Sequence, residues 1–151
     1  MTNADRLTIN WHHTSTVVTD VDQAIAFRQS LVDSQVLFRE SAMREQIQSM
    51  LGIDGISCDL VQMQIASSGH VQEFIAFHDL PTDADDRLPI RIGQGHVAYV
   101  VPSLEEAIIA ITAGGGAVVG RVTDFDEGPA VYCYSPSGEV IELEERRIQG
   151  G

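Results

Sequence analysis

The chain has 151 residues, of which 44% are hydrophobic and 21% are charged, a balance typical of one globular domain with a single core. Its net charge of -13 argues against nucleic acids and anionic membranes as partners, because both bind clusters of Lys and Arg that this sequence lacks. No apolar stretch approaches the ~20 residues of a membrane span, and the N-terminus lacks the basic and apolar regions of a signal peptide, so we expect a cytoplasmic protein.

The first predicted elements are a strand and a helix. Residues 8–18 are rich in Thr and Val, and their alternation predicts a strand that turns His13 and every second residue to one face. Thr19 or Asp20 can cap the helix that follows, which should end near Asp33. The apolar residues assigned to one stripe of this helix are Val21, Ile25, Phe27, Leu31 and Val32.

Three more strands and a short helix complete the first half. They are a strand at 35–41, a helix at 42–52 closed by Gly52, a strand at 56–66 and a strand at 71–78. A linker is expected over about residues 80–92, since LPTDADDRLP places two prolines around an acidic run with few apolar residues.

The second half repeats this order with shorter elements. They are a strand at 95–102, a helix at 103–116 capped by Ser103, a strand at 117–122 and a hairpin at 130–145 with SPSG at its turn. Each half therefore predicts a βαβββ module, about 7–79 for the first and about 93–146 for the second. The expected fold is α+β, a single domain over residues 1–151 in which two curved sheets meet at a cleft.

An internal repeat selects the candidate site residues. HTSTVVTDVDQAIAF aligns with HVAYVVPSLEEAIIA and pairs His13 with His96. SGHVQEF aligns with SGEVIEL and pairs Glu73 with Glu142. Two His and two Glu related by a repeat are the ligands that a metal site on a pseudo-twofold axis requires.

Each ligand has a rival close by in the sequence. Neighbours on a strand point to opposite faces, so only one of His12 and His13 is expected in the cleft, and the repeat favours His13. Gln72 and Glu144 are rivals of the two glutamates, and the repeat favours the glutamates without excluding either rival.

The remaining His and Cys residues are assigned no role in the site. His70 and His78 lie near strand ends in polar surroundings and are expected on the surface. Cys58 and Cys133 lie in predicted strands without CxxC spacing, so we expect buried free thiols.

Four motifs, in order from about Leu7 to Glu145, carry a family resemblance. HHTSTVVTDVDQAIAF, MLGIDGI, GHVAYVVPSLEEAI and VYCYSPSGEVIEL together resemble the vicinal oxygen chelate superfamily, which includes glyoxalase I, methylmalonyl-CoA epimerase, extradiol dioxygenases, fosfomycin-resistance enzymes and bleomycin-binding proteins. The resemblance implies a homodimer and a divalent ion (Zn, Ni, Co, Mn or Fe). The ligands that it implies are His13, Glu73, His96 and Glu142.

The expected function is a metal-dependent lyase or isomerase that removes a proton beside a carbonyl of a small oxygenated substrate. By resemblance to glyoxalases, Glu73 or Glu142 is the base. One alternative is an Fe(II) extradiol-type ring-cleavage dioxygenase, which needs two His and one carboxylate, so that Glu73 would occupy a position needed by substrate or dioxygen. The other is a drug- or small-molecule-binding protein without catalysis, although such members of the superfamily lack the metal ligands.

The chain departs from common family members in ways that bear on the substrate. Arg28 follows the helix Phe where Tyr is usual, and Ser135 stands in the turn where Asp is usual. Asp54 lies near, but not in register with, the acidic catalytic residue of epimerase-like relatives. Arg28, Arg91 and Arg121 are the few cations that could meet an anionic substrate. A CoA thioester is therefore not favoured, because its phosphates would need more such partners.

Overall fold

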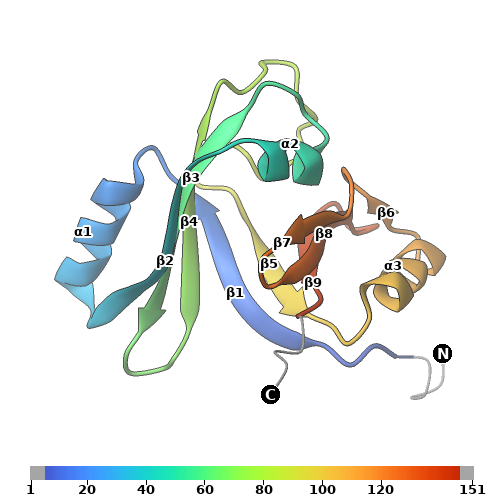
Figure 1. The fold of residues 1–151 in the computed structure, drawn as a ribbon, viewed down its shortest axis with the longest axis horizontal. Coiled ribbons are helices and arrows are strands. Elements are labelled where there is room, and N and C mark those ends of the chain that lie inside the picture. The colour runs from blue at the N-terminus through green and yellow to red at the C-terminus, as the bar shows by residue number, and fades with distance from the viewer. Residues whose placement is uncertain (1–5, 147–151) are drawn as a thin grey trace.

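The computed structural model describes residues 6–146, which form three helices and a nine-stranded mixed sheet (Figure 1). The helices are α1 (Val21–Leu31), α2 (Glu45–Leu51) and α3 (Leu104–Ala113). The strands are β1 (Asn10–Val17), β2 (Ser34–Met43), β3 (Ser57–Ile65), β4 (Val71–His78), β5 (Gly95–Val100), β6 (Ala117–Val118), β7 (Thr123–Phe125), β8 (Gly128–Tyr134) and β9 (Val140–Glu144). None of these helices is long and apolar enough to span a membrane.

The sheet joins the two halves of the chain through their opening strands. Its order is β2-β3-β4-β1-β5-β9-β8-β6, and β7 pairs with β8. The central pair, β1 and β5, is antiparallel, while β1 with β4 and β5 with β9 are parallel. The predicted α+β fold is confirmed, and the opening and closing strands of both halves lie together in the middle of the sheet.

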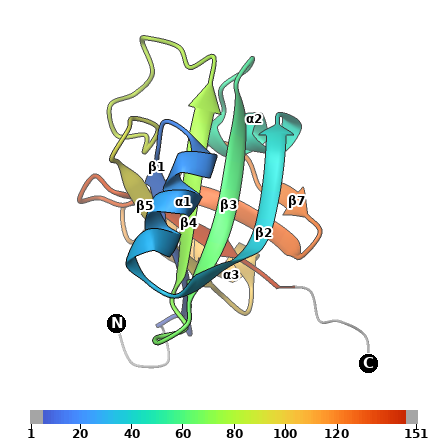
Figure 2. The ribbon, with the colours of Figure 1, turned by 90° about the vertical axis from the view of Figure 1, so that its left-hand side faces the viewer.

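Two helices cover the outer faces of the two halves. Helix α1 packs Val21 against a cluster that includes Met63 and Phe74, on one side of β3 and β4 (Figure 2). Helix α3 packs Ala107 against Val131 and neighbouring residues of the second half. The opposite, inner faces are therefore free of these helices.

The third and largest cluster lies between the inner faces. Helix α2 contributes Ile47 and Met50, which pack with Leu60 and Ile75 of the first half and with Tyr132 of the second. This apolar cluster therefore packs residues of the two halves against each other between the inner faces.

The predicted helix caps agree with the structure, but the predicted start of the second helix is wrong, because Ala42 and Met43 belong to β2 and α2 begins at Glu45. The Asp20 side chain accepts a hydrogen bond from the Gln23 backbone N–H, and the Ser103 hydroxyl accepts one from the Glu106 N–H. Gly52 ends α2 in the left-handed conformation at φ 69°. These caps are local, which is why the sequence alone predicts them.

The predicted apolar stripe of α1 is wrong in its second half. Val21 is buried and Ile25 packs beside it, but Phe27 and Leu31 are 62% and 58% exposed. With 3.6 residues per turn, Phe27 lies about 240° around the helix from Val21, so the two cannot share one face. Val32, just after the helix, is 38% exposed.

The second half differs from the predicted order between residues 117 and 128. The strand predicted at 117–122 has only two residues, and β7 was not predicted. After Val118 the chain turns toward α2, where the Arg121 N–H donates to the Ser49 carbonyl. A Cβ on Gly120 would lie 2.3 Å from that same carbonyl oxygen, so glycine permits this close approach.

The proline-bracketed segment expected to be a linker contributes to the core. Leu88 and Ile90 are 4% and 3% exposed and belong to the cluster around α2. Both cysteines, Cys58 and Cys133, are buried and free as expected.

Candidate metal centre

Two parallel rows of paired residues place the four predicted ligands on the inner face of the sheet. In the first row, Glu73 of β4 pairs with Ser15 of β1, which pairs with His96 of β5. In the second row, His13 pairs with Ala98, which pairs with Glu142 of β9. Residues that pair across strands point to the same face, so the pseudo-twofold relation between the halves becomes a cluster of two His and two Glu.

The four side chains converge at short distances. His13 Nε2 lies 3.5 Å from Glu73 Oε2 and 3.5 Å from Glu142 Oε2. His96 Nε2 lies 4.0 Å from Glu73 Oε1 and 3.9 Å from Glu142 Oε2. The repeat pairs His13 with His96, 83 positions apart, and Glu73 with Glu142, 69 positions apart. The fold brings all four side chains to one point.

Three of the converging atoms lack the hydrogen bonds that burial normally demands. His13 Nε2, His96 Nε2 and Glu142 Oε2 are buried and have no hydrogen-bond partner among residues 6–146. One donor atom from each of these residues lies within 4.8 Å of the others. Orphaned buried polar atoms are costly, and nitrogen and carboxylate oxygen together suit a divalent cation, so these residues fit a metal ion.

The two carboxylates have different surroundings despite the repeat. Gln62 of β3 pairs with Glu73 and donates a 2.9 Å hydrogen bond to its Oε2. At the corresponding place beside Glu142 stands Tyr132, with no hydrogen bond to Glu142 Oε2 from any described residue. Glu73 Oε2 is therefore held by a neighbouring amide, whereas Glu142 Oε2 has no such partner among the described residues.

The pKa values of the two glutamates differ in the same way as their hydrogen bonds. Burial alone would raise the pKa of Glu73, but His13, His96 and the Gln62 hydrogen bond outweigh it and lower that pKa to about 2. Burial, followed by repulsion from Glu144 and Glu73, raises the pKa of Glu142 well above its usual value. Without a cation, Glu142 thus favours the protonated form while Glu73 stays ionised.

The two histidines also differ. Burial lowers the pKa of His96 to about 4, and the attraction of Glu73 is too weak to reverse this. Burial would also lower the pKa of His13, but the adjacent Glu73 carboxylate prevails and raises it. A neutral His96 is the form that binds a metal.

The lowered pKa of His96 predicts an acid-sensitive fold for protein stripped of metal by a chelator. Between pH 6.5, where an unfolded His gains its proton, and about pH 4, where His96 does, protons favour the unfolded chain. Acidification through this window should remove up to about 3 kcal/mol of unfolding free energy through this residue. In urea titrations across the window, His96→Asn should lose stability less steeply than the wild-type protein. Parallel curves for the two proteins would contradict the assignment.

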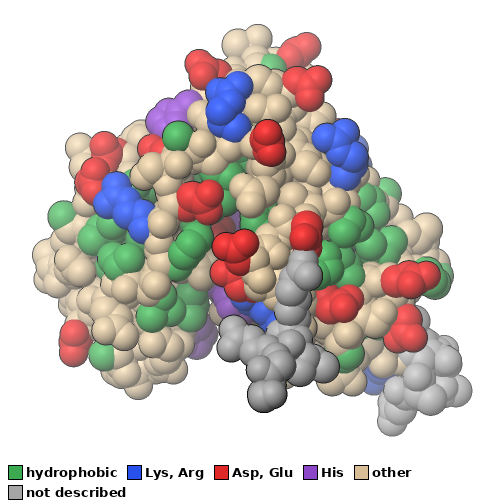
Figure 3. All heavy atoms as spheres, in the orientation of Figure 1, with side chains coloured by type: hydrophobic (Ala, Val, Ile, Leu, Met, Phe, Trp, Pro, Cys, Tyr) green, Lys and Arg blue, Asp and Glu red, His purple; other side chains and the backbone are tan. Residues whose placement is uncertain are grey.

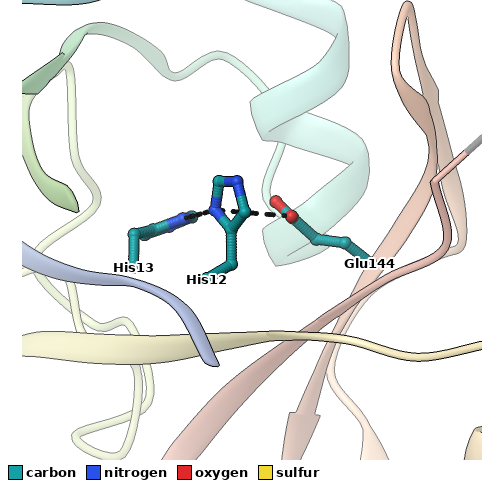
Figure 4. A group of neighbouring side chains, drawn as sticks. All are labelled: His12, His13 and Glu144. Carbon is teal, nitrogen blue, oxygen red and sulfur yellow. Dashed lines mark hydrogen bonds and ion pairs between the residues drawn. The ribbon is translucent and has the colours of Figure 1, made fainter. Parts of the chain in front are cut away.

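His12 enters the neighbourhood of the site against the prediction that only one of the adjacent histidines would. The β1–β5 register shifts between Trp11 and His13, so His12 is the extra residue of a β-bulge. Its Nδ1 lies 2.7 Å from His13 Nδ1 and 3.7 Å from Glu144 Oε2, and Figure 4 shows His12 between the other two. Simple alternation fails here because a bulge interrupts it.

Arg146 is hydrogen-bonded to both His12 and Glu144. Its guanidinium donates to His12 Nε2 at 2.6 Å and to Glu144 Oε2 at 2.8 Å. A donor atom from each of His12, His13 and Glu144 lies within 4.8 Å of the others, so these three form a second possible ligand group. His12 and Glu144 are already hydrogen-bonded to Arg146, which is itself a cation. This second group therefore fits a metal ion less well than the group of His13, His96 and Glu142 does.

The other rivals and surface candidates lie away from the centre. Gln72 pairs with Met63, a residue of the outer cluster, and so faces away from Glu73. His70 is exposed, and His78 lies 3.0 Å from Asp59 near the surface.

The centre opens into a cavity of about 200 Å³ that both halves line. Figure 3 shows Asp and Glu side chains around the hollow in the middle of one face. The lining residues with carboxylates are Glu40, Glu73, Asp126, Glu127, Glu142, Glu144 and Glu145. The apolar lining includes Met43, Ile47, Met50, Leu60 and Ile75.

The cations considered from the sequence do not line this cavity, and Arg146 does. Arg28 stands over the Phe74 ring at 5.1 Å, Arg91 pairs with Asp86, and Arg121 is exposed on the segment before β7. Asp54 is exposed and is not part of the lining. The signal for Arg146 was its alternation with Glu142 and Glu144 beyond the end of the last strand.

Known proteins match this chain in fold but not in sequence. No family model matches the chain, and no curated protein does. Methylmalonyl-CoA epimerase from Mycobacterium tuberculosis superposes with a TM-score of 0.70 at 16% identity, over 98% of this chain and 94% of that one. A variant of methylmalonyl-CoA epimerase from Streptomyces coelicolor, in complex with 2-nitronate-propionyl-CoA, gives 0.61 at 16% identity over 95% and 100%.

A more distant enzyme has the same fold within a longer chain. A 2,3-dioxygenase from Pseudomonas sp. KL28 gives a TM-score of 0.56 at 13% identity, over 94% of this chain and 44% of that one. These are structures of the vicinal oxygen chelate superfamily, so the resemblance carried by the motifs is confirmed at the level of the fold.

Proposed function

We propose that this protein is a divalent-metal-dependent lyase or isomerase that removes a proton next to a carbonyl of a small oxygenated substrate. The observation that carries the proposal is the set of orphaned buried atoms, His13 Nε2, His96 Nε2 and Glu142 Oε2, beside the anchored Glu73. Both glutamates line the cavity, where a small substrate can reach them.

His13, Glu73, His96 and Glu142 would hold the ion. When bound, the ion acts as a Lewis acid that polarises a carbonyl and stabilises the negative charge that develops as a proton leaves. Two neutral imidazoles and two carboxylates balance a divalent charge, so the centre is neutral overall.

The two carboxylates take different roles. Glu73 is held by Gln62 at 2.9 Å and is already ionised, which suits a permanent ligand. Glu142 has an oxygen with no hydrogen-bond partner in the described chain and a pKa raised by burial, which suits a group that accepts a proton. We therefore assign Glu142 as the base.

The surroundings favour such a proton transfer. Met43, Leu60 and Ile75 line the cavity near the centre and are 5%, 7% and 3% exposed. This apolar wall lowers the local dielectric constant, so the interactions of Glu142 with developing charge are stronger than in water. The position of Glu73 argues against the alternative function, an Fe(II) dioxygenase. Its side chain points toward His13 and would occupy a coordination position that catechol or dioxygen needs.

Protein purified without chelators should contain about one equivalent of a divalent metal and should exchange the carbon-bound protons of hydroxyacetone for deuterium. Elemental analysis measures the first property, and proton NMR in D₂O measures the second. Chelation should abolish exchange, and titration with the metal should restore it. Less than a tenth of an equivalent, with no metal binding by calorimetry, would remove the proposal.

A further inference from the structure

The cavity carries carboxylates that the proposed metal centre does not use. Glu144 is bonded to Arg146, and Glu145 accepts a hydrogen bond from the Leu104 N–H at the start of α3. Three other carboxylates of the lining have no hydrogen bond or ion pair to any residue within 6–146. They are Glu40, Asp126 and Glu127.

These three carboxylates lie apart from the ligands. Glu40 of β2 pairs with Leu60 of β3, which pairs with Ile75 of β4, so one apolar residue separates Glu40 from the strand that carries Glu73. At 4.7–4.9 Å per strand, Glu40 lies roughly 10 Å across the sheet from the strand that carries Glu73.

The second half brings its two carboxylates to the cavity by another route. Asp126 and Glu127 form the two-residue turn between β7 and β8, where Phe125 pairs with Gly128. On β8, Ala130 pairs with Glu144, and Tyr132 pairs with Glu142. The turn thus lies beyond Ala130, more than one row of the sheet away from Glu142.

No available cation offsets this charge. Arg146 is the only Lys or Arg among the described lining residues, and it already bonds Glu144 at 2.8 Å and His12 at 2.6 Å. A divalent ion on two glutamates leaves the metal end neutral. The potential at the other end is therefore negative, and the stretch between the two ends is apolar.

We propose that the substrate carries a cationic group, such as an amine, at the end opposite its chelating oxygens, with a short apolar segment between them. The chelating oxygens of the substrate lie at the metal centre, and its apolar segment lies along Met43, Leu60 and Ile75. Its cationic group faces Glu40, Asp126 and Glu127. This inference rests on the proposed function and names its substrate class. The epimerase in the comparison holds a CoA derivative, whose phosphates would meet the wrong charge here.

Three hydroxamates with the same six-carbon chain test the charge preference, because they share one chelating end and differ at the other. They are 6-aminohexanohydroxamic acid, hexanohydroxamic acid and adipic monohydroxamic acid. Calorimetry on the metal-loaded protein should show the amine binding about tenfold tighter than the neutral compound, and the acid binding most weakly. The advantage of the amine should shrink as NaCl is raised from low to physiological concentration.

Matched variants separate the cavity from the overall charge of the protein. The triple variant Glu40→Gln, Asp126→Asn and Glu127→Gln should bind the amine and the neutral compound equally. The control triple variant Asp54→Asn, Asp83→Asn and Glu105→Gln removes the same charge from exposed positions outside the lining, and it should keep the preference.

The outcomes distinguish this inference from the proposed function. Metal binding with equal affinities for the three compounds, or with the acid bound most tightly, overturns the cationic substrate and leaves the metal-dependent function standing. A control triple variant that loses the preference as fully as the cavity variant also overturns it. Failure to bind any metal overturns both.

Discussion

Glu142→Gln is expected to slow proton exchange on hydroxyacetone by about a thousandfold while the protein still binds its metal. The substitution keeps the size of the side chain and an oxygen donor, but an amide cannot accept the proton. Glu142 is the glutamate whose Oε2 has no hydrogen-bond partner among the described residues, so its loss should leave the rest of the centre in place. Exchange rates by NMR and metal affinity by calorimetry measure the two properties separately.

Glu73→Gln is the matched control for that variant. Its side chain is anchored by Gln62 and lies 3.5 Å from His13 Nε2, so the substitution should weaken metal affinity first. Exchange measured at saturating metal should then fall by less than in Glu142→Gln. If the two variants lose exchange equally at full metal occupancy, the division of roles between the glutamates is wrong.

Gly95→Ala is expected to have the largest effect on stability, at least about 3 kcal/mol of unfolding free energy. Gly95 begins β5 and pairs with Thr16, and a Cβ there would lie 1.8 Å from the Ser15 carbonyl oxygen. That oxygen belongs to the backbone of the central strand β1, so relief requires the two halves of the sheet to separate. His96 follows directly, and its alignment with Ser15 should be lost as well.

Gly114→Ala provides the control for this prediction. The nearest atom to a Cβ on Gly114 is a carbonyl oxygen at 3.4 Å, an ordinary contact, so the change should stay within about 1 kcal/mol. Urea unfolding followed by circular dichroism measures both variants. Equal midpoints for the two would show that β1 and β5 tolerate a wider spacing than the structure has.

The sequence by itself determined the local features and the repeat. Asp20 and Ser103 cap their helices because each cap depends on a side chain and a backbone N–H three residues away. The SPSG turn forms because Gly138 adopts φ 99°, which few other residues tolerate. The repeat singled out four residues that the fold places together, because two copies of one module meet about a pseudo-twofold axis.

Only the tertiary structure decided what surrounds those four residues. The bulge that brings His12 onto His13 depends on the pairing of β1 with β5, which no local pattern encodes. Arg146, Glu40 and the Asp126–Glu127 turn reach one cavity from separate elements of both halves. Their convergence follows from strand order and packing between distant segments. The charge of the cavity, on which the proposed substrate class rests, therefore could not be inferred from spacing along the chain.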